Sequence, residues 1–202
     1  SGLARFDPKT EKFTNFQNNP SNKNSISNNS ILALFEDNQN RIWIGTQSGI
    51  DVLDKSDNHF YRNPIVLNNS SVWVRSIVQD QKGFFWAGTQ GSGMLKISYE
   101  NNKIEILNQI TSKDELSPSY LSNSFVNSLF IDQSQNLWIG TLNGLDKTDL
   151  KDPKFKLYRK SSESTSIDLL DNVIASIYKD RKGNIWVGNW GKGMNIVDRK
   201  TN

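Results

Sequence analysis

Residues 31–46 read ILALFEDNQNRIWIGT, and related stretches recur three more times along the chain. Residues 74–89 read VRSIVQDQKGFFWAGT, residues 126–141 read VNSLFIDQSQNLWIGT, and residues 174–189 read IASIYKDRKGNIWVGN. In every copy an Asp lies six residues before a Trp, and a Gly lies two residues after that Trp. Successive Trp residues are 43, 52 and 48 positions apart, which is typical of β-propeller blades and not of helical or leucine-rich repeats.

Each repeat predicts four short antiparallel β-strands. The first strand is aliphatic and ends at the Asp, and the second carries the Trp. The third follows a Gly, at residues 49–53, 93–97, 144–146 and 193–197, and the fourth lies at residues 60–61, 104–106 and 155–158. In the turn between the first two strands the Asp can accept backbone N–H bonds, and a Gly or Asn can take positive φ. Gln135 breaks this pattern, which predicts a strained or looser turn. The fold class is therefore all-β, built from propeller blades.

The repeats divide residues 1–202 as one array of about four blades. Residues 1–20 hold the tail of one blade, three blades follow at about 28–62, 72–108 and 123–159, and an incomplete last blade lies at about 171–198. An open array leaves an apolar blade face at each end. We therefore expect a piece of a longer protein, completed by the remainder of that chain or by a second copy. In the second-copy case, the strand around residues 13–16 would close the blade at residues 193–197.

The four recurring Trp residues are predicted to be the structural core between blades. A buried Trp removes about 150–250 Å² from water, which is worth up to roughly 4–6 kcal/mol. That is enough to hold one twisted sheet against the next. The predicted core residues are Trp43, Trp86, Trp138 and Trp186.

Composition argues against several classes of function. The net charge is only +3 and the basic residues are scattered, so no nucleic-acid partner is predicted. There is no Cys and the single His is His59, which argues against thiolate metal sites and His-based catalysis. Lys82 and Lys182 stand where calcium ligands would be needed. We predict no catalytic residue, no metal and no cofactor. No apolar run approaches the roughly 20 residues that span a bilayer, so no membrane contact is expected.

The recurring pattern resembles the two-component regulator propeller repeat, from residues 2–7 to Asp198. It departs from that repeat at Ala87, at Asn189 and in the loops at residues 90–92 and 190–192. The resemblance implies large seven-bladed propellers in the periplasmic sensor regions of Bacteroides-type hybrid two-component systems, which respond to glycans. It further implies that any kinase lies elsewhere in a longer protein, that the segment is periplasmic, and that it offers no catalytic residue.

Comparison of the repeats with one another separates scaffold positions from variable ones. The position seven before the Asp holds Ser, Trp, Phe or Val, and the position five before it holds Leu, Arg, Asn or Ala. In propellers these positions open on the same face as the loops between the second and third strands. Aromatic rings beside amides and a guanidinium suit an oligosaccharide or another small ligand. The predicted ligand-binding residues are Trp73, Arg75, Gln90, Phe125, Asn127, Asn143, Asn189 and Trp190.

Three alternatives stay open from the sequence. Trp73 and Phe125 could fill the core of their loops instead of binding a ligand. The propeller could be a scaffold for protein–protein interaction, which requires a broad exposed apolar patch. It could also be a polysaccharide-active enzyme, which requires convergent carboxylates with perturbed pKa values.

Overall fold

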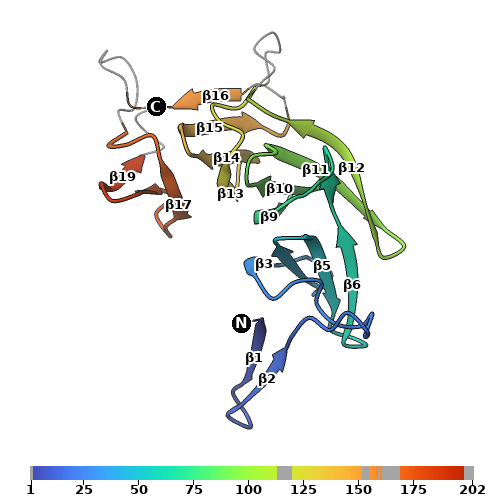
Figure 1. Ribbon diagram of the computed structural model, residues 1–202. Coiled ribbons are helices and arrows are strands. Elements are labelled where there is room, and N and C mark those ends of the chain that lie inside the picture. Colours follow the sequence, from blue (N-terminus) through green and yellow to red (C-terminus); the bar gives the residue numbers. More distant parts are fainter. Residues whose placement is uncertain (1, 113–119, 152–154, 159, 161–168, 198–202) are drawn as a thin grey trace.

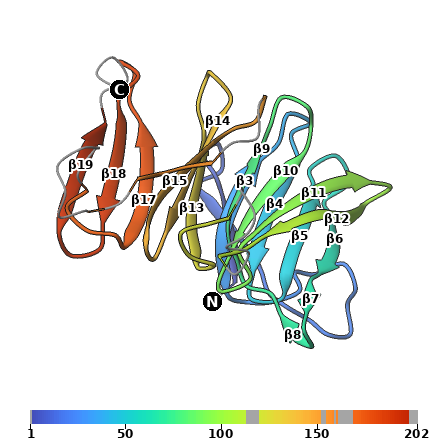
Figure 2. The ribbon, with the colours of Figure 1, turned by 90° about the horizontal axis from the view of Figure 1, so that it is seen from above.

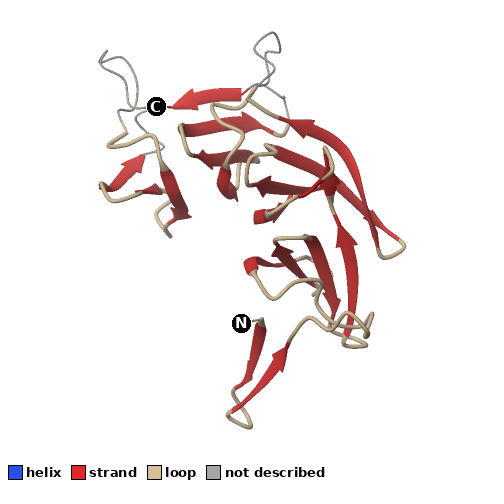
Figure 3. Ribbon diagram, viewed as in Figure 1, coloured by secondary structure: helices blue, strands red, loops and turns tan. Residues whose placement is uncertain are grey.

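The structure is a computed structural model that describes residues 2–112, 120–151, 155–158, 160 and 169–197. Every regular element in this part of the chain is a β-strand, as Figure 3 shows. The strands form several antiparallel sheets of up to four strands each. The prediction of an all-β fold made of propeller blades is confirmed. Within the same residues, no helix could span a membrane.

The blades follow the repeats closely. A hairpin of β1 (Leu3–Asp7) and β2 (Lys12–Phe16) precedes the first blade, which consists of β3 (Ile31–Glu36), β4 (Ile42–Thr46), β5 (Gly49–Asp54) and β6 (His59–Pro64). The second blade consists of β9 (Val74–Gln79), β10 (Phe85–Thr89), β11 (Met94–Glu100) and β12 (Lys103–Ile110). The third consists of β13 (Val126–Ile131), β14 (Asn136–Thr141), β15 (Gly144–Asp149) and β16 (Phe155–Tyr158). The last has β17 (Ile174–Lys179), β18 (Ile185–Asn189) and β19 (Gly193–Val197) among the described residues.

The blades lie side by side along an open arc, with the β1–β2 hairpin at one end and the last blade at the other (Figures 1 and 2). Within each blade the strands pair in sequence order. The first strands lie innermost, and neighbouring ones contact each other: β3 lies beside β9, β9 beside β13, and β13 beside β17. One addition was not expected, a small hairpin of β7 (Val66–Leu67) and β8 (Ser70–Ser71) between the first two blades.

The Trp of each blade faces the following blade. Trp43 is fully buried and stacks on Phe85 of the second blade, with ring centroids 3.7 Å apart. Trp86 packs in one cluster with Val126 and other residues of the third blade, and Trp138 packs with Ile174 of the last blade. The recurring spacing of the repeat therefore places one indole in each of the three contacts between neighbouring blades.

The Gly after each of these Trp residues leaves room for the next blade. A Cβ at Gly45 would lie 2.5 Å from the carbonyl oxygen of Val74, and one at Gly88 would lie 2.6 Å from a methyl carbon of Val126. A Cβ at Gly140 would lie 2.7 Å from Ile174. These distances are shorter than atoms can approach, so the first strand of each following blade requires a Gly at that position.

Each Trp also donates a hydrogen bond to the Asp that precedes it by six residues. The indole Nε1 to carboxylate Oδ2 distances are 2.8, 3.0, 3.2 and 2.9 Å along the four repeats. The other carboxylate oxygen, Oδ1, accepts two backbone N–H groups of the turn, as at Asp37, where the donors are Gln39 and Arg41. We call this arrangement the Asp–Trp clamp, and it fixes the turn against the second strand of its own blade.

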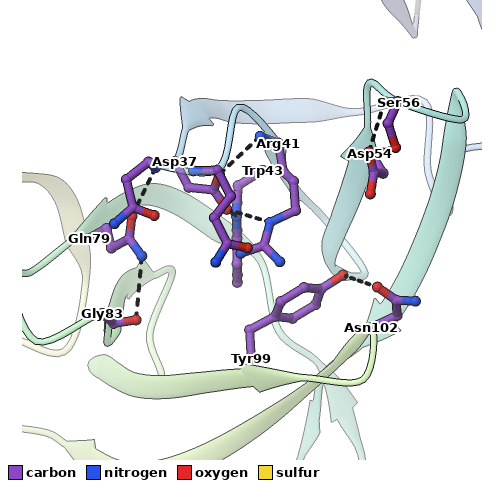
Figure 4. A network of polar contacts seen from close by, with 11 residues as sticks. Asp37, Arg41, Trp43, Asp54, Ser56, Gln79, Gly83, Tyr99 and Asn102 are labelled. Carbon is purple, nitrogen blue, oxygen red and sulfur yellow. Dashed lines mark hydrogen bonds and ion pairs between the residues drawn. The ribbon is translucent and has the colours of Figure 1, made fainter.

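The clamp of the first blade is part of a larger polar network (Figure 4). Arg41 forms an ion pair with Asp37, with Nε to Oδ2 at 2.7 Å, and its guanidinium lies 4.6 Å from the centre of the Tyr99 ring. The ring of Tyr99 also meets Trp43 edge-on at 5.0 Å. Burial raises the pKa of Tyr99 to about 12, so its phenol stays protonated in this contact between blades.

Hydrogen bonding lowers the pKa of three turn carboxylates, those of Asp37, Asp132 and Asp180. Burial alone would raise the pKa of Asp37, but the bonds from the Trp43 indole and from Arg41 together outweigh it. The same balance lowers the pKa of Asp132. At Asp180 the bond from Trp186 has the largest effect, and the pKa falls to about 2. The clamps therefore favour the ionised carboxylate.

The turn at Gln135 keeps the geometry of the other three. Its backbone N–H donates to the carbonyl oxygen of Asp132 at 2.9 Å, as Asn40 does to Asp37. Gln135 takes a φ of 63°, a conformation that L side chains adopt at some energetic cost. The prediction of a looser turn is therefore wrong, and the prediction of a strained backbone is confirmed. The Gln135 side chain offsets this cost by accepting the backbone N–H of Gln81 in the preceding blade, at 3.2 Å.

The last blade presents an apolar face that no described residue covers. Met194 and Ile196 are 59% and 53% exposed, whereas their counterparts in the first blade, Ile50 and Val52, are fully buried against the second blade. Trp186 is accordingly only half-buried, unlike the other three recurring Trp residues. The sequence predicts that Trp186 packs between two blades, and this packing would require a further blade.

Candidate ligand-binding site

The loops between the second and third strands are held in place by the Thr that ends the second strand. Thr46, Thr89 and Thr141 are buried, and each hydroxyl donates to the carbonyl oxygen of the Gly that begins or directly precedes the third strand, at 3.2, 2.6 and 2.9 Å. The same hydroxyl oxygens accept a backbone N–H from within the loop. These loops are therefore rigid supports for the residues that they present.

Residues just before each first strand lie beside these loops. The backbone N–H of Gln90 donates to the carbonyl oxygen of Trp73 at 3.0 Å, and Gln90 also forms a β-bridge with Phe125 of the next blade. In the third blade the N–H of Leu142 donates to the carbonyl oxygen of Phe125 at 3.1 Å. The backbone thus brings residues of two blades together around Gln90.

These contacts link five residues of the second and third blades, which we call the loop-face patch: Trp73, Arg75, Gln90, Phe125 and Leu142. Trp73 is 37% exposed and Phe125 is 40% exposed. The ring of Phe125 lies over Gly91, where a Cβ would be 3.4 Å from the ring. Phe125 therefore packs on its neighbouring loop, and both aromatic residues are partly open to solvent.

Arg75 reaches the same patch from β9. Its guanidinium Nη1 donates to the side-chain oxygen of Gln90 at 2.8 Å, and the side chain is half-buried. The patch therefore combines two aromatic surfaces with an amide and a cation.

Four further residues predicted for the site lie outside the patch. Trp190 is 73% exposed at the end of the last blade's second strand, where its N–H donates to the carbonyl oxygen of Val173. Asn143 is exposed in the third blade's loop. Asn127 is half-buried, and its amide donates to the carbonyl oxygen of Ile174 at 3.1 Å. Asn189 is buried and donates to the carbonyl oxygen of Asp171 at 2.8 Å, so we do not include its side chain in the binding surface.

A set of buried polar contacts beneath the loop face was not predicted from the sequence. In the third strand of the first blade, buried Asp51 accepts the backbone N–H of Ser27 at 2.6 Å and so ties down the segment before β3. Asp146 does the same for Ser122 at 2.9 Å, and Asn195 for Leu170 at 3.0 Å. Burial raises the pKa of Asp51. The alternation of this polar residue with Ile50 and Val52 was the available signal in the sequence.

No residue of the loop-face patch is an Asp, Glu, His or Cys. Within the described ranges, no group of three or more His, Cys, Asp or Glu side chains could hold a metal ion. The carboxylates with shifted pKa values in the blades are those of three Asp–Trp clamps, Asp51, which anchors a loop, and Asp54, which accepts hydrogen bonds from Ser56. His59 is half-buried in the first blade, with its ring 4.6 Å from that of Tyr61, and it is not a patch residue.

A sequence model of the two-component regulator propeller family matches four segments of the chain, at residues 25–48, 67–91, 120–143 and 168–191. Each segment contains the end of one loop, the first strand, the Asp–Trp clamp and the beginning of the next loop. The chain belongs to the two-component regulator propeller repeat family. This confirms the resemblance drawn from the sequence.

Among known proteins, the chain is similar to "Histidine kinase P4" of Formosa agariphila, with 29% identity over 189 residues. The alignment covers 89% of this chain and 12% of that kinase. The fold is similar to the extracellular domains of two proteins of B. thetaiotaomicron that are assigned to hybrid two-component systems. The first has a TM-score of 0.74 and 24% identity over 96% of this chain and 24% of that one. The second has a TM-score of 0.58 and 21% identity over 98% and 30% of the two chains. This chain therefore spans only a small part of each relative.

Proposed function

We propose that this propeller segment is the ligand-binding part of an extracytoplasmic sensor in two-component signal transduction, and that its ligand is an oligosaccharide. Membership of the two-component regulator propeller family supports the role in signalling. The likeness to domains named as extracellular supports a location outside the cytoplasm, which for an inner-membrane sensor is the periplasm. Any kinase activity would belong to another part of a longer protein, as the partial match to a histidine kinase suggests.

The loop-face patch is the observation that carries the proposed ligand. Trp73 and Phe125 expose parts of their rings on either side of Gln90, which lies between them through a backbone hydrogen bond and a β-bridge. A sugar ring can stack its apolar face on such rings while its hydroxyl groups bond to amide and guanidinium groups.

Isothermal titration calorimetry with a panel of neutral and acidic oligosaccharides tests this function. We expect at least one member of the panel to bind, and Trp73→Ala to weaken its affinity at least tenfold because the stacking surface is removed. Tyr178→Ala is the matched control, since it removes an exposed aromatic ring that lies opposite Trp186 in the last blade and outside the patch. Binding that survives Trp73→Ala unchanged, or a complete lack of binding across the panel, would contradict the proposal.

We further propose that blades from the remainder of a longer chain cover the two open faces. Leu34 of the first blade is exposed, whereas its counterpart Ile77 is buried by the preceding blade. The β1–β2 hairpin covers only the outer part of the first blade, where Leu3 and Phe16 pack. A second copy fits less well than additional blades. The β1–β2 hairpin occupies the place of the third and fourth strands of a blade before the first one. The last blade already has its own third strand, β19. If a second copy supplied its hairpin to complete the last blade, two third strands would compete for one position.

A disulfide test separates these partners, because the chain has no Cys. Between the second and third blades, the Ser76 hydroxyl lies 2.9 Å from the backbone nitrogen of Leu129. At the two uncovered faces, the equivalent positions are Ser176 of the last blade and Leu34 of the first blade. Mixing the Ser176→Cys and Leu34→Cys variants should give no rapid mixed dimer if the proposal holds, and the double variant Ser76→Cys, Leu129→Cys is the positive control. Efficient formation of the mixed dimer would instead identify a second copy as the partner.

A further inference from the structure

The cation in the loop-face patch is not required by the scaffold. Arg75 occupies the position five residues before the turn Asp, where the other three blades have Leu32, Asn127 and Ala175. Three blades of the same fold thus form without a charge at this position. Asn127 uses its side chain to bond the next blade, whereas the side-chain bond of Arg75 is to Gln90 of its own loop.

Arg75 also lacks a carboxylate partner among the described residues. The ion pairs in that part of the chain are those of Arg41 with Asp37 and of Lys55 with Glu36. A guanidinium carries five N–H donors, and the neutral oxygen of Gln90 accepts from Nη1. A half-buried cation loses hydration that a neutral acceptor restores only in part. Arg75 therefore retains capacity for an anionic acceptor.

The short stretches that lie directly beside the patch supply almost no acidic side chain that could act as this acceptor. The four loops between second and third strands, at residues 47–48, 90–92, 142–143 and 190–192, contain no Asp or Glu, and the last contains Lys192. In the three residues before each first strand, the one acidic residue is Asp171. Its carboxylate already accepts the backbone N–H of Val173 at 3.0 Å. Asp171 is thus the one acidic residue in these short stretches, and Asp51 and Asp146 lie buried beneath the face, where each accepts a backbone N–H.

From these observations we infer that the ligand bound at the loop-face patch presents a carboxylate group to Arg75, as a uronic acid residue of an oligosaccharide would. This inference rests on the proposed function and specifies its ligand. The planar guanidinium can bind a carboxylate through two parallel N–H bonds. The sugar ring stacks on Trp73 or Phe125, and its carboxylate replaces the missing counter-charge.

Calorimetry with matched ligands tests this assignment. The probes are trigalacturonic acid and trimannuronic acid, each compared with its fully methyl-esterified form, which has the same rings and no charge. We expect at least one free acid to bind at least tenfold more tightly than its ester, and this preference to weaken as salt is raised because it is electrostatic. Arg75→Met should abolish the preference, and Arg75→Lys should keep part of it.

Two controls distinguish recognition from a purely structural role of Arg75. Arg181→Met removes an exposed Arg from the turn between the first two strands of the last blade, away from the loop-face patch. This variant should leave the preference for the free acid unchanged. If Arg75 only positioned Gln90, Arg75→Met would weaken acid and ester equally.

The outcomes also separate this inference from the proposed function. Equal binding of acid and ester, with both abolished by Trp73→Ala, would overturn the inference and leave an oligosaccharide site in place. The same conclusion would follow if the acid preference survived Arg75→Met. A lack of binding by every acid and ester, and by the wider panel, would overturn both.

Discussion

Truncation of Trp43 is the strongest available perturbation of the packing between blades. The side chain is fully buried, its ring stacks on Phe85 at 3.7 Å, and its indole N–H bonds to Asp37 at 2.8 Å. Trp43→Ala would leave a cavity between the first two blades and remove a donor from a buried carboxylate. Substitutions of this kind cost about 3–5 kcal/mol.

The matched control is Trp186→Ala. Trp186 has the same clamp, with a bond of 2.9 Å to Asp180, but it is half-buried because no described residue covers that face. Its truncation should therefore destabilise the chain by only about 1–2 kcal/mol, which is the cost of losing the clamp and part of the packing.

Urea denaturation followed by circular dichroism at pH 7 would measure both effects. The urea midpoint should fall far more for Trp43→Ala than for Trp186→Ala, provided that the dependence of the free energy of unfolding on urea stays similar. Equal losses for the two variants would refute the reasoning, since packing against the next blade is the main difference between the two sites.

Three further predictions concern the same scaffold. Gly45→Ala should destabilise the chain by about 1–3 kcal/mol, because its Cβ would lie 2.5 Å from the backbone oxygen of Val74. Gly188→Ala should cost less than about 1 kcal/mol, because the nearest atom is the rotatable Ser176 hydroxyl; urea midpoints that rank the two variants the other way would contradict this. The pKa values of Asp37, Asp132 and Asp180 are lowered, so the clamps stabilise the fold above the unfolded value near 3.9. That stability should be lost as pH falls toward 2, and a urea midpoint that stays constant from pH 5 to pH 2 would exclude it. Burial raises the pKa of Asp51, so its ionisation opposes folding as pH rises through that same unfolded value. Asp51→Asn should therefore raise the urea midpoint at pH 7 and lose this advantage below about pH 4, and a variant less stable than the wild type at pH 7 would show the carboxylate to be favourable.

The fold could be predicted because four copies of one pattern constrain each other. A single Asp followed by a Trp says little, but four repetitions with the same spacing define strands, turns and core together. The direct hydrogen bond from each indole to its Asp was missed, although the constant spacing of six residues was its signal. The strained turn at Gln135 was predicted only in part, because the stabilising bond to Gln81 comes from a neighbouring blade.

The site was harder to predict for physical reasons. Variation among the repeats marks positions where the residue type differs between blades, but variation cannot tell an exposed residue from one with a local structural role. Asn189 replaces a Thr at the end of a second strand, and the structure buries its side chain against the loop at Asp171. Leu142 joins the patch through a backbone bond to Phe125, a contact that depends on the geometry of the bridge between blades and left no trace in the residue types.

The most direct test of ligand binding at the loop-face patch is the indole N–H region of the two-dimensional NMR spectrum. The chain has six Trp residues. Four indoles are held in Asp–Trp clamps, and two, those of Trp73 and Trp190, lie at the exposed face. On titration with the tightest-binding oligosaccharide, the signal of Trp73 should shift, with or without that of Trp190, while the four clamped signals stay in place. Shifts confined to the clamped indoles, or no shift of the Trp73 signal at saturation, would contradict the account.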